Sequence, residues 1–108
     1  MLDVMPLQTA VDALADRLRV LPQSVLSRGA AAEGLALARD LAARAQRIES
    51  PEREPHAFPD AGMFAVGDQV AVAGHDLVEA LRTAGNGPEA VAELAEALEL
   101  VRDTVKRC

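Results

Sequence analysis

Residues 88–106 read PEAVAELAEALELVRDTVK, and this stretch decides the fold because its apolar residues recur three or four positions apart. The spacing follows the 3.6-residue turn of an α-helix and places the apolar side chains on one face. Pro88 and Glu89 suit the first turn of a helix, and Lys106 and Arg107 suit the last. We therefore expect one long amphipathic helix here. Its apolar stripe consists of Val91, Leu94, Leu98, Val101 and Val105.

The same periodicity appears in three earlier segments and predicts helices at about residues 6–19, 23–49 and 61–84. Asp60 is expected to cap the start of the third helix, since its side chain can accept a hydrogen bond from a free backbone N–H.

Two glycines, Gly67 and Gly74, lie beside the apolar stripe of the helix predicted at 61–84. A glycine inside a helix costs up to ~1 kcal/mol relative to alanine, so a packing or backbone reason is expected for each. We expect a close crossing with a neighbouring helix, a local kink, or a later helix start near Asp68.

The connections between these helices indicate how they are arranged. Residues 50–60 hold three prolines, which excludes a helix there, whereas the other two connections are short. We predict an all-α single domain over residues 1–108. The architecture is an antiparallel four-helix bundle, formed by two helical pairs that the Pro-rich loop joins. A second copy could complete the core of such a bundle across a two-fold axis.

Composition excludes several classes of protein. The 108 residues carry 11 basic and 17 acidic side chains, a net charge of −6, which argues against bulk attraction to nucleic acid or to an anionic membrane. The only cysteine is Cys108, so no disulfide can form within the chain. No signal peptide and no membrane span are expected. Arginine and alanine are abundant and lysine is rare, so we expect a bacterial, cytoplasmic protein from a high-GC genome.

Residues for catalysis are scarce. The sequence has no Gly-rich phosphate loop, no Ser-His-Asp arrangement and no Cys-x-x-Cys pair. Asp68, His75, Glu79 and Arg82 share one face of the third helix, and a histidine and a glutamate four residues apart can bind one metal ion. A site would need a third ligand from elsewhere, so we interpret this face as a solvated polar surface. We expect no enzyme activity, no cofactor and no metal.

Residues 13–28 resemble a helix-turn-helix. In that comparison Ala15 is the small residue facing the second helix, Val20 follows the turn, and Val25 locks the second helix in place. The resemblance departs at the turn, where Arg19 stands in place of the usual glycine. It implies that residues 22–28 would read DNA in the major groove. The side chains expected to contact DNA are Gln23, Ser24, Ser27 and Arg28.

Two groups of residues are candidates for a protein partner. Phe58 and Phe64 bracket the end of the Pro-rich loop, where they either plug one end of the core or form an exposed docking site. Glu89, Glu93 and Glu96 form an acidic stripe on the last helix, which is either a solvated face or a docking surface for a basic partner.

The function we expect is therefore that of a non-enzymatic module for protein–protein interaction or regulation. It would self-associate as a homodimer and bind an unidentified protein partner, mainly through the second and fourth helices. The alternative is a small helix-turn-helix regulator that reads DNA with residues 22–28 and dimerises through its other helices.

Overall fold

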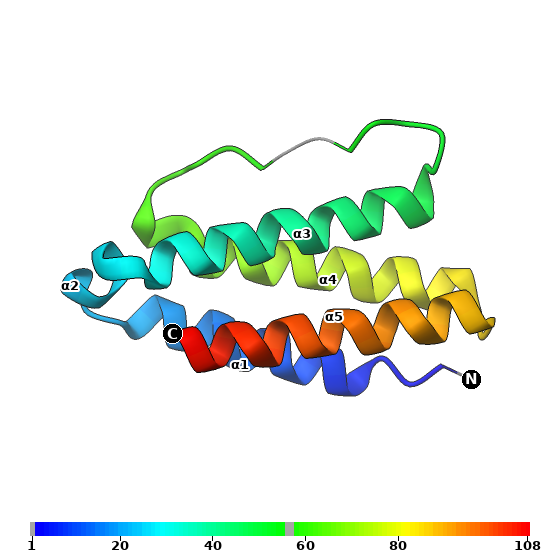
Figure 1. Cartoon of the computed structure of the whole chain (residues 1–108), viewed down its shortest axis with the longest axis horizontal. Helices are drawn as coiled ribbons and strands as arrows, with labels where there is room; N and C mark the ends of the chain where they lie inside the picture. The colour runs from blue at the N-terminus through cyan, green and yellow to red at the C-terminus, as the bar shows by residue number, and fades with distance from the viewer. Residues whose placement is uncertain (1, 56–57) are drawn as a thin grey trace.

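The computed structural model describes residues 2–55 and 58–108, and four long helices account for most of it (Figure 1). These helices pack against one another, and no strand occurs among the described residues, which confirms the predicted all-α four-helix bundle. The long helices are α1 (Met5–Val20), α3 (Ala31–Glu49), α4 (Val66–Ala84) and α5 (Pro88–Arg107). The short elements are α2 (Gln23–Val25), the π-helical turn η1 (Leu26–Ala30) and the 3₁₀ turn η2 (Met63–Ala65).

The two helical pairs, α1 with α3 and α4 with α5, are each antiparallel, as predicted (Figure 1). The relative direction of the two pairs is a feature that the periodicity does not predict. Gly34, near the start of α3, packs against Val66, the first residue of α4, so the two helices begin side by side and run in the same direction. Residues 56 and 57 of the predicted loop lie outside the described residues.

The α1–α4 contact is a close crossing, one of the alternatives expected from the two glycines. A Cβ atom on Gly74 would lie 2.3 Å from Cγ1 of Val11, and one on Gly67 would lie 2.9 Å from the carbonyl oxygen of Ala15. Any side chain at either position would therefore clash with α1. The helix accepts two residues of poor helix propensity because they let the two backbones approach.

Between α1 and α3 the chain turns at Gly29. The predicted helical range of 23–49 is reproduced, but it is bent, because Gly29 within η1 has a φ of 154° that residues with a Cβ rarely adopt. Leu26 and Ala30 flank the bend and are both buried. The bend therefore directs η1 and α3 onto the same core.

Helix α4 begins five residues after the predicted start at residue 61, closer to the alternative start near Asp68. Asp60 does not cap the helix; its Oδ1 instead accepts the N–H of Gly62 at 2.9 Å in a local turn. Gly62 then has a φ of 93°, which redirects the chain into η2, and the α-helix begins only at Val66. Because the residues before the helix form a turn, the helix begins later in the chain than residue 61.

The core lies mainly between α1, α3 and α4. The apolar stripe of α4 is fully buried, and so is that of α1 apart from the half-buried Leu21. The buried stripe residues are Val66, Val70, Ala73, Leu77 and Leu81 on α4, and Leu7, Val11, Leu14 and Leu18 on α1. On α5 the apolar stripe is only partly covered by the bundle, because Val91 is 49% exposed and Val105 is 41% exposed. The buried residues of α5 are Ala97, Val101 and Thr104.

Candidate interaction surfaces

Three large apolar side chains of α5 lie outside the core, and they form a surface that we call the α5 stripe, defined as Val91, Leu98 and Val105. Leu98 is half-buried, and Val91 and Val105 at the two ends are exposed. The three residues are seven positions apart, the spacing that keeps side chains in line along the seam of a coiled coil. Leu94 and Leu100 do not belong to the stripe, because they are half-buried and pack against the core.

Helix α1 lies along one side of α5. Nη2 of Arg17 donates a hydrogen bond to the carbonyl oxygen of Cys108 at 3.1 Å, and the backbone N–H of Leu2 donates to Oδ1 of Asn86 at 2.5 Å. These contacts join the two ends of α1 to the two ends of α5, so the helices run parallel (Figure 1). Ala13 is exposed one turn before Arg17 and therefore lies on the same face of α1.

Ion pairs attach the other side of α5 to α3. Nη1 of Arg44 donates to Oε1 of Glu93 at 2.8 Å, and Nε of Arg107 donates to Oε2 of Glu33 at 2.8 Å near the opposite end of the helices. The side chain of Arg44 is only 15% exposed. Burial disfavours its charge, but hydrogen bonds to Asp40 and Glu93 outweigh burial and raise the pKa of Arg44 above its usual value.

The predicted acidic surface of α5 is therefore divided. Glu93 is occupied by Arg44, whereas Glu89 and Glu96 are exposed. The sequence indicates the pairing of Arg44 with Asp40, four residues away, but contains no signal for the pairing with Glu93 on another helix. A docking surface made of all three glutamates stays a prediction, and it would have to displace an existing ion pair.

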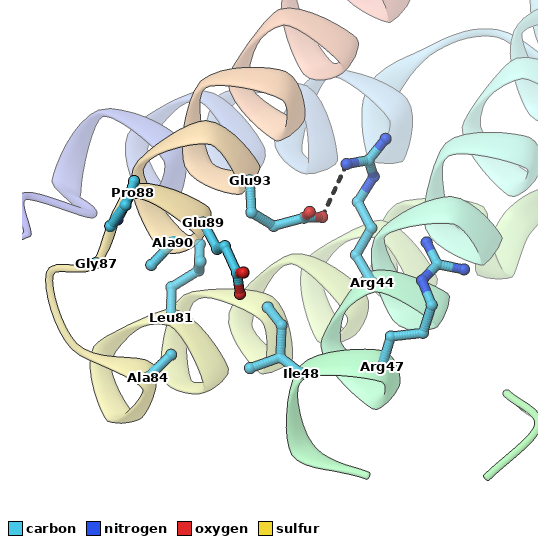
Figure 2. Close-up of a pocket in the computed structure, with 10 residues that line it drawn as sticks. All are labelled: Arg44, Arg47, Ile48, Leu81, Ala84, Gly87, Pro88, Glu89, Ala90 and Glu93. Atoms are coloured by element: carbon cyan, nitrogen blue, oxygen red, sulfur yellow. Dashed lines mark hydrogen bonds and ion pairs between the residues drawn. The ribbon is translucent and has the colours of Figure 1, made fainter. Parts of the chain in front are cut away.

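A pocket of about 540 Å³ lies where α3 and α4 end and α5 begins (Figure 2). Arg44 and Glu93 face each other on one wall, Arg47 lies on the rim, and Ile48 and Leu81 supply apolar surface. The arrangement can receive an amphipathic group, but the facing charges of Arg44 and Glu93 already neutralise each other. Every buried side-chain nitrogen or oxygen in the described residues has a hydrogen-bond partner, so none is aimed at a ligand here.

The structure separates the two phenylalanines. Phe58 is half-buried and packs against the core, while its carbonyl oxygen accepts Nε of Arg39 at 2.9 Å. Phe64 in η2 is 73% exposed. Phe58 therefore covers the core, and only Phe64 keeps the character of an exposed docking residue. Val20, the last residue of α1, is also exposed, at 79%.

The residues of the helix-turn-helix resemblance do not adopt the geometry it implies. Helix α1 continues through Arg19 to Val20, and no residue other than glycine has a positive φ in the described chain. Gln23, Ser24, Ser27 and Arg28 are all exposed. However, Oγ of Ser27 and Nε of Arg28 both donate to the carbonyl oxygen of Ser24, at 3.4 and 3.1 Å.

The polar face of α4 contacts α1. Nε2 of His75 lies 2.6 Å from Oδ1 of Asp12, and Nη2 of Arg19 lies 2.9 Å from Oδ1 of Asp68. His75 is thus directed toward α1 and not toward Glu79. Within residues 2–55 and 58–108, no three side chains of His, Cys, Asp or Glu group closely enough to hold a metal ion.

Comparison with known proteins adds no function to this geometry. No protein-family model, no curated protein and no solved structure matches the chain. Across the described part of the chain, none of the helices combines the length and the apolar character needed to cross a membrane.

Proposed function

We propose that this protein is a non-enzymatic, bacterial and cytoplasmic module that works by binding another protein through the α5 stripe. The observation that supports this most strongly is the exposure of Val91 and Val105 at 49% and 41%, on the helix with the most regular apolar spacing in the chain. An apolar row that the fold itself leaves in water is typical of a surface that another protein covers.

The way α5 packs explains why its large side chains remain available. The residues that α5 buries are Ala97, Val101 and Thr104, and Leu94 and Leu100 pack against the core beside them. Leu98 and the two valines of the stripe lie on a neighbouring face of the helix, which the bundle does not cover fully. Burial of apolar surface stabilises a complex by roughly 25 cal/mol per Å², before the entropy cost of association. A partner helix packed on the stripe would bury the apolar side chains that the bundle leaves exposed.

A binding role also fits the charged groups. Arg44, the most enclosed arginine beside the pocket, is held by Asp40 and Glu93, and these pairs attach α5 to α3. Such a group acts as a structural clamp, because a proton donor or acceptor in catalysis must be able to exchange its partner for a substrate. The clamp keeps α5 in place with its stripe turned outward.

Photo-crosslinking in the organism that makes the protein tests this proposal. A photoreactive phenylalanine derivative replaces Leu98 in one variant and Glu96 in a matched control, because Glu96 is exposed on the same helix, away from the stripe. We expect a discrete crosslinked protein band from position 98 and not from position 96. The proposal is overturned if position 98 gives no band, or if both positions give the same bands.

A further inference from the structure

We infer that the occupant of the α5 stripe is a second copy of this chain, paired antiparallel with α5 around Leu98. This inference rests on the proposed function, because it names the partner of the same surface. The resulting interface is isologous, so the same residues contribute from both copies.

The spacing of the stripe is symmetric about its centre. Val91 precedes Leu98 by seven residues and Val105 follows it by seven. A two-fold axis at Leu98 therefore places Val91 of each copy opposite Val105 of the other. Both end residues are exposed and Leu98 is half-buried. The three apolar side chains of one copy can therefore pack against the same three side chains of a second copy in reversed order.

The charges of α5 favour the antiparallel direction. Residues 88–97 carry three acids and no base, whereas residues 98–107 carry three bases and two acids. An antiparallel pair brings the acidic half of each helix beside the more basic half of the other. Glu93 and Arg107 are already paired with α3 and Glu96 faces away from the stripe, so this contrast acts as a long-range difference in charge and not through ion pairs across the seam.

A parallel pair would instead bring like charges together. Arg102 follows Leu98 by four residues and would face its own copy, and Arg17 of α1 lies at the same end, beside Cys108. In the antiparallel pair, Arg102 lies at the level of Leu94 and Ala95 of the other copy. The two copies of Arg102 are then about 12 Å apart along the helix axis, given the rise of 1.5 Å per residue.

Small residues on both sides of the stripe leave space for a second helix. Ala95 on α5 and Ala13 on α1 are both exposed. Helix axes approach to 8–10 Å depending on the side chains at the contact, and alanine permits the shorter distances. The flanks therefore present no bulky side chain at these two positions to hold the second copy away.

Disulfide formation between single cysteines tests the pairing. All variants carry Cys108→Ser so that the introduced thiol is the only one. Leu98→Cys alone should form a covalent dimer, and Val91→Cys should form one when mixed with Val105→Cys. Val91→Cys alone should not, because two copies of position 91 lie about 21 Å apart in the antiparallel pair. Glu96→Cys, on another face of α5, is the matched control.

The expected rates differ clearly. Thiols held together in a dimer react as if at millimolar concentration, so Leu98→Cys should link at least about tenfold faster than Glu96→Cys. Equal rates at positions 98 and 96, or fast linking of Val91→Cys with itself, would overturn the antiparallel pair. The antiparallel pair would also be overturned if wild-type chains linked through Cys108 as fast as Leu98→Cys, because Cys108 lies ten residues from the centre and its two copies would be far apart.

The two proposals fail in different ways. If the chain does not dimerise but photo-crosslinking at position 98 still captures a protein of different mass, the second copy is the wrong occupant and the stripe remains a binding surface. If position 98 captures nothing at all, the proposed function fails as well. Circular dichroism of each cysteine variant shows whether its helices remain folded. Val91→Cys and Val105→Cys are the safest variants, since both side chains are exposed.

Discussion

Val11 of α1 occupies the space that a side chain on Gly74 of α4 would need. A Cβ atom at Gly74 would lie 2.3 Å from Cγ1 and 2.8 Å from Cγ2 of Val11. Val11 is fully buried, so it has no solvent-filled space into which to move. The contact holds α1 and α4 at a short distance, and both helices contribute heavily to the core.

Gly74→Ala should therefore destabilise the protein, although alanine is the better helix former. The change gains up to ~1 kcal/mol of helix propensity but overpacks a tight contact, at a cost of about 1–3 kcal/mol. We expect a net loss of roughly 1 kcal/mol or more in the free energy of unfolding, measured by urea denaturation. A more stable variant would contradict the close crossing.

Truncation of Val11 provides the control for this effect. Val11→Ala alone should destabilise the protein by leaving a cavity. In the double variant with Gly74→Ala, the new methyl group occupies part of that cavity, so the two losses should not add. A double-mutant cycle measures this coupling. Simple additivity would mean that the two residues do not share the space.

The ion pair between Arg44 and Glu93 gives a second prediction. Glu93→Gln leaves a mostly buried guanidinium with one carboxylate fewer, so we expect a loss of about 1–2 kcal/mol in the free energy of unfolding. Glu96→Gln removes an exposed carboxylate and should change stability by less than about 0.5 kcal/mol. Thermal unfolding of the two variants compares them directly. Equal effects would show that the pair does not clamp α5.

Much of the fold follows from periodicity, but the rotation of α5 does not. On α4 the predicted stripe and the two glycines beside it are all buried, because α4 packs against both α1 and α3, so the burial agrees with the prediction. On α5 apolar residues and alanines together cover a wider arc. The spacing alone cannot decide whether Val91 or Ala97 faces the core. Packing against α1 and α3 decides it, in favour of the smaller residue.

Cys108 should react slowly as a thiol. Burial raises the pKa of its thiol, and the nearby carboxylate of Glu33 raises it further, while Arg17 and Arg107 oppose the shift. At about pH 8.5, near the ordinary thiol range, iodoacetamide should alkylate the native protein more slowly than the chain unfolded in urea. Glu33→Gln should increase the native rate. Equal native and unfolded rates would contradict this environment.

The raised pKa of the Cys108 thiol also makes the stability of the protein depend on pH. Because the folded chain holds the thiol proton more tightly than the unfolded chain, the contribution of Cys108 is present at neutral pH and is lost as the pH rises through the raised pKa. Cys108→Ser should therefore weaken the decline of stability at alkaline pH. Urea denaturation at neutral and alkaline pH, compared with wild type, measures this difference. An identical pH dependence in both proteins would exclude the effect.

The candidate site is less predictable than the fold. Phe58 and Phe64 are equivalent in the sequence, yet one covers the core and the other stays in water, because the turn at Gly62 redirects the chain between them. Likewise, Glu93 cannot be distinguished from Glu96 until α3 brings Arg44 beside it. Such long-range pairings carry no local signal.

Duplex DNA binding remains the alternative prediction, and we expect it to fail. Helix α1 runs through the position where the turn of a helix-turn-helix would lie, and the side chain of Arg28 is bonded back to Ser24. Fluorescence anisotropy at low salt should show no binding to random-sequence duplexes. Salt-sensitive binding that Arg28→Ala weakens would instead support the DNA regulator.

The most direct test of the α5 stripe is the mass of the protein in solution by light scattering, with reductant present. We expect wild type to have twice its chain mass of 11.4 kDa. Leu98→Lys should have the mass of one chain, while Glu96→Lys, with the same new charge on another face, should remain a dimer. A wild-type protein with the mass of one chain, or a Leu98→Lys variant that remains a dimer, would contradict pairing through α5.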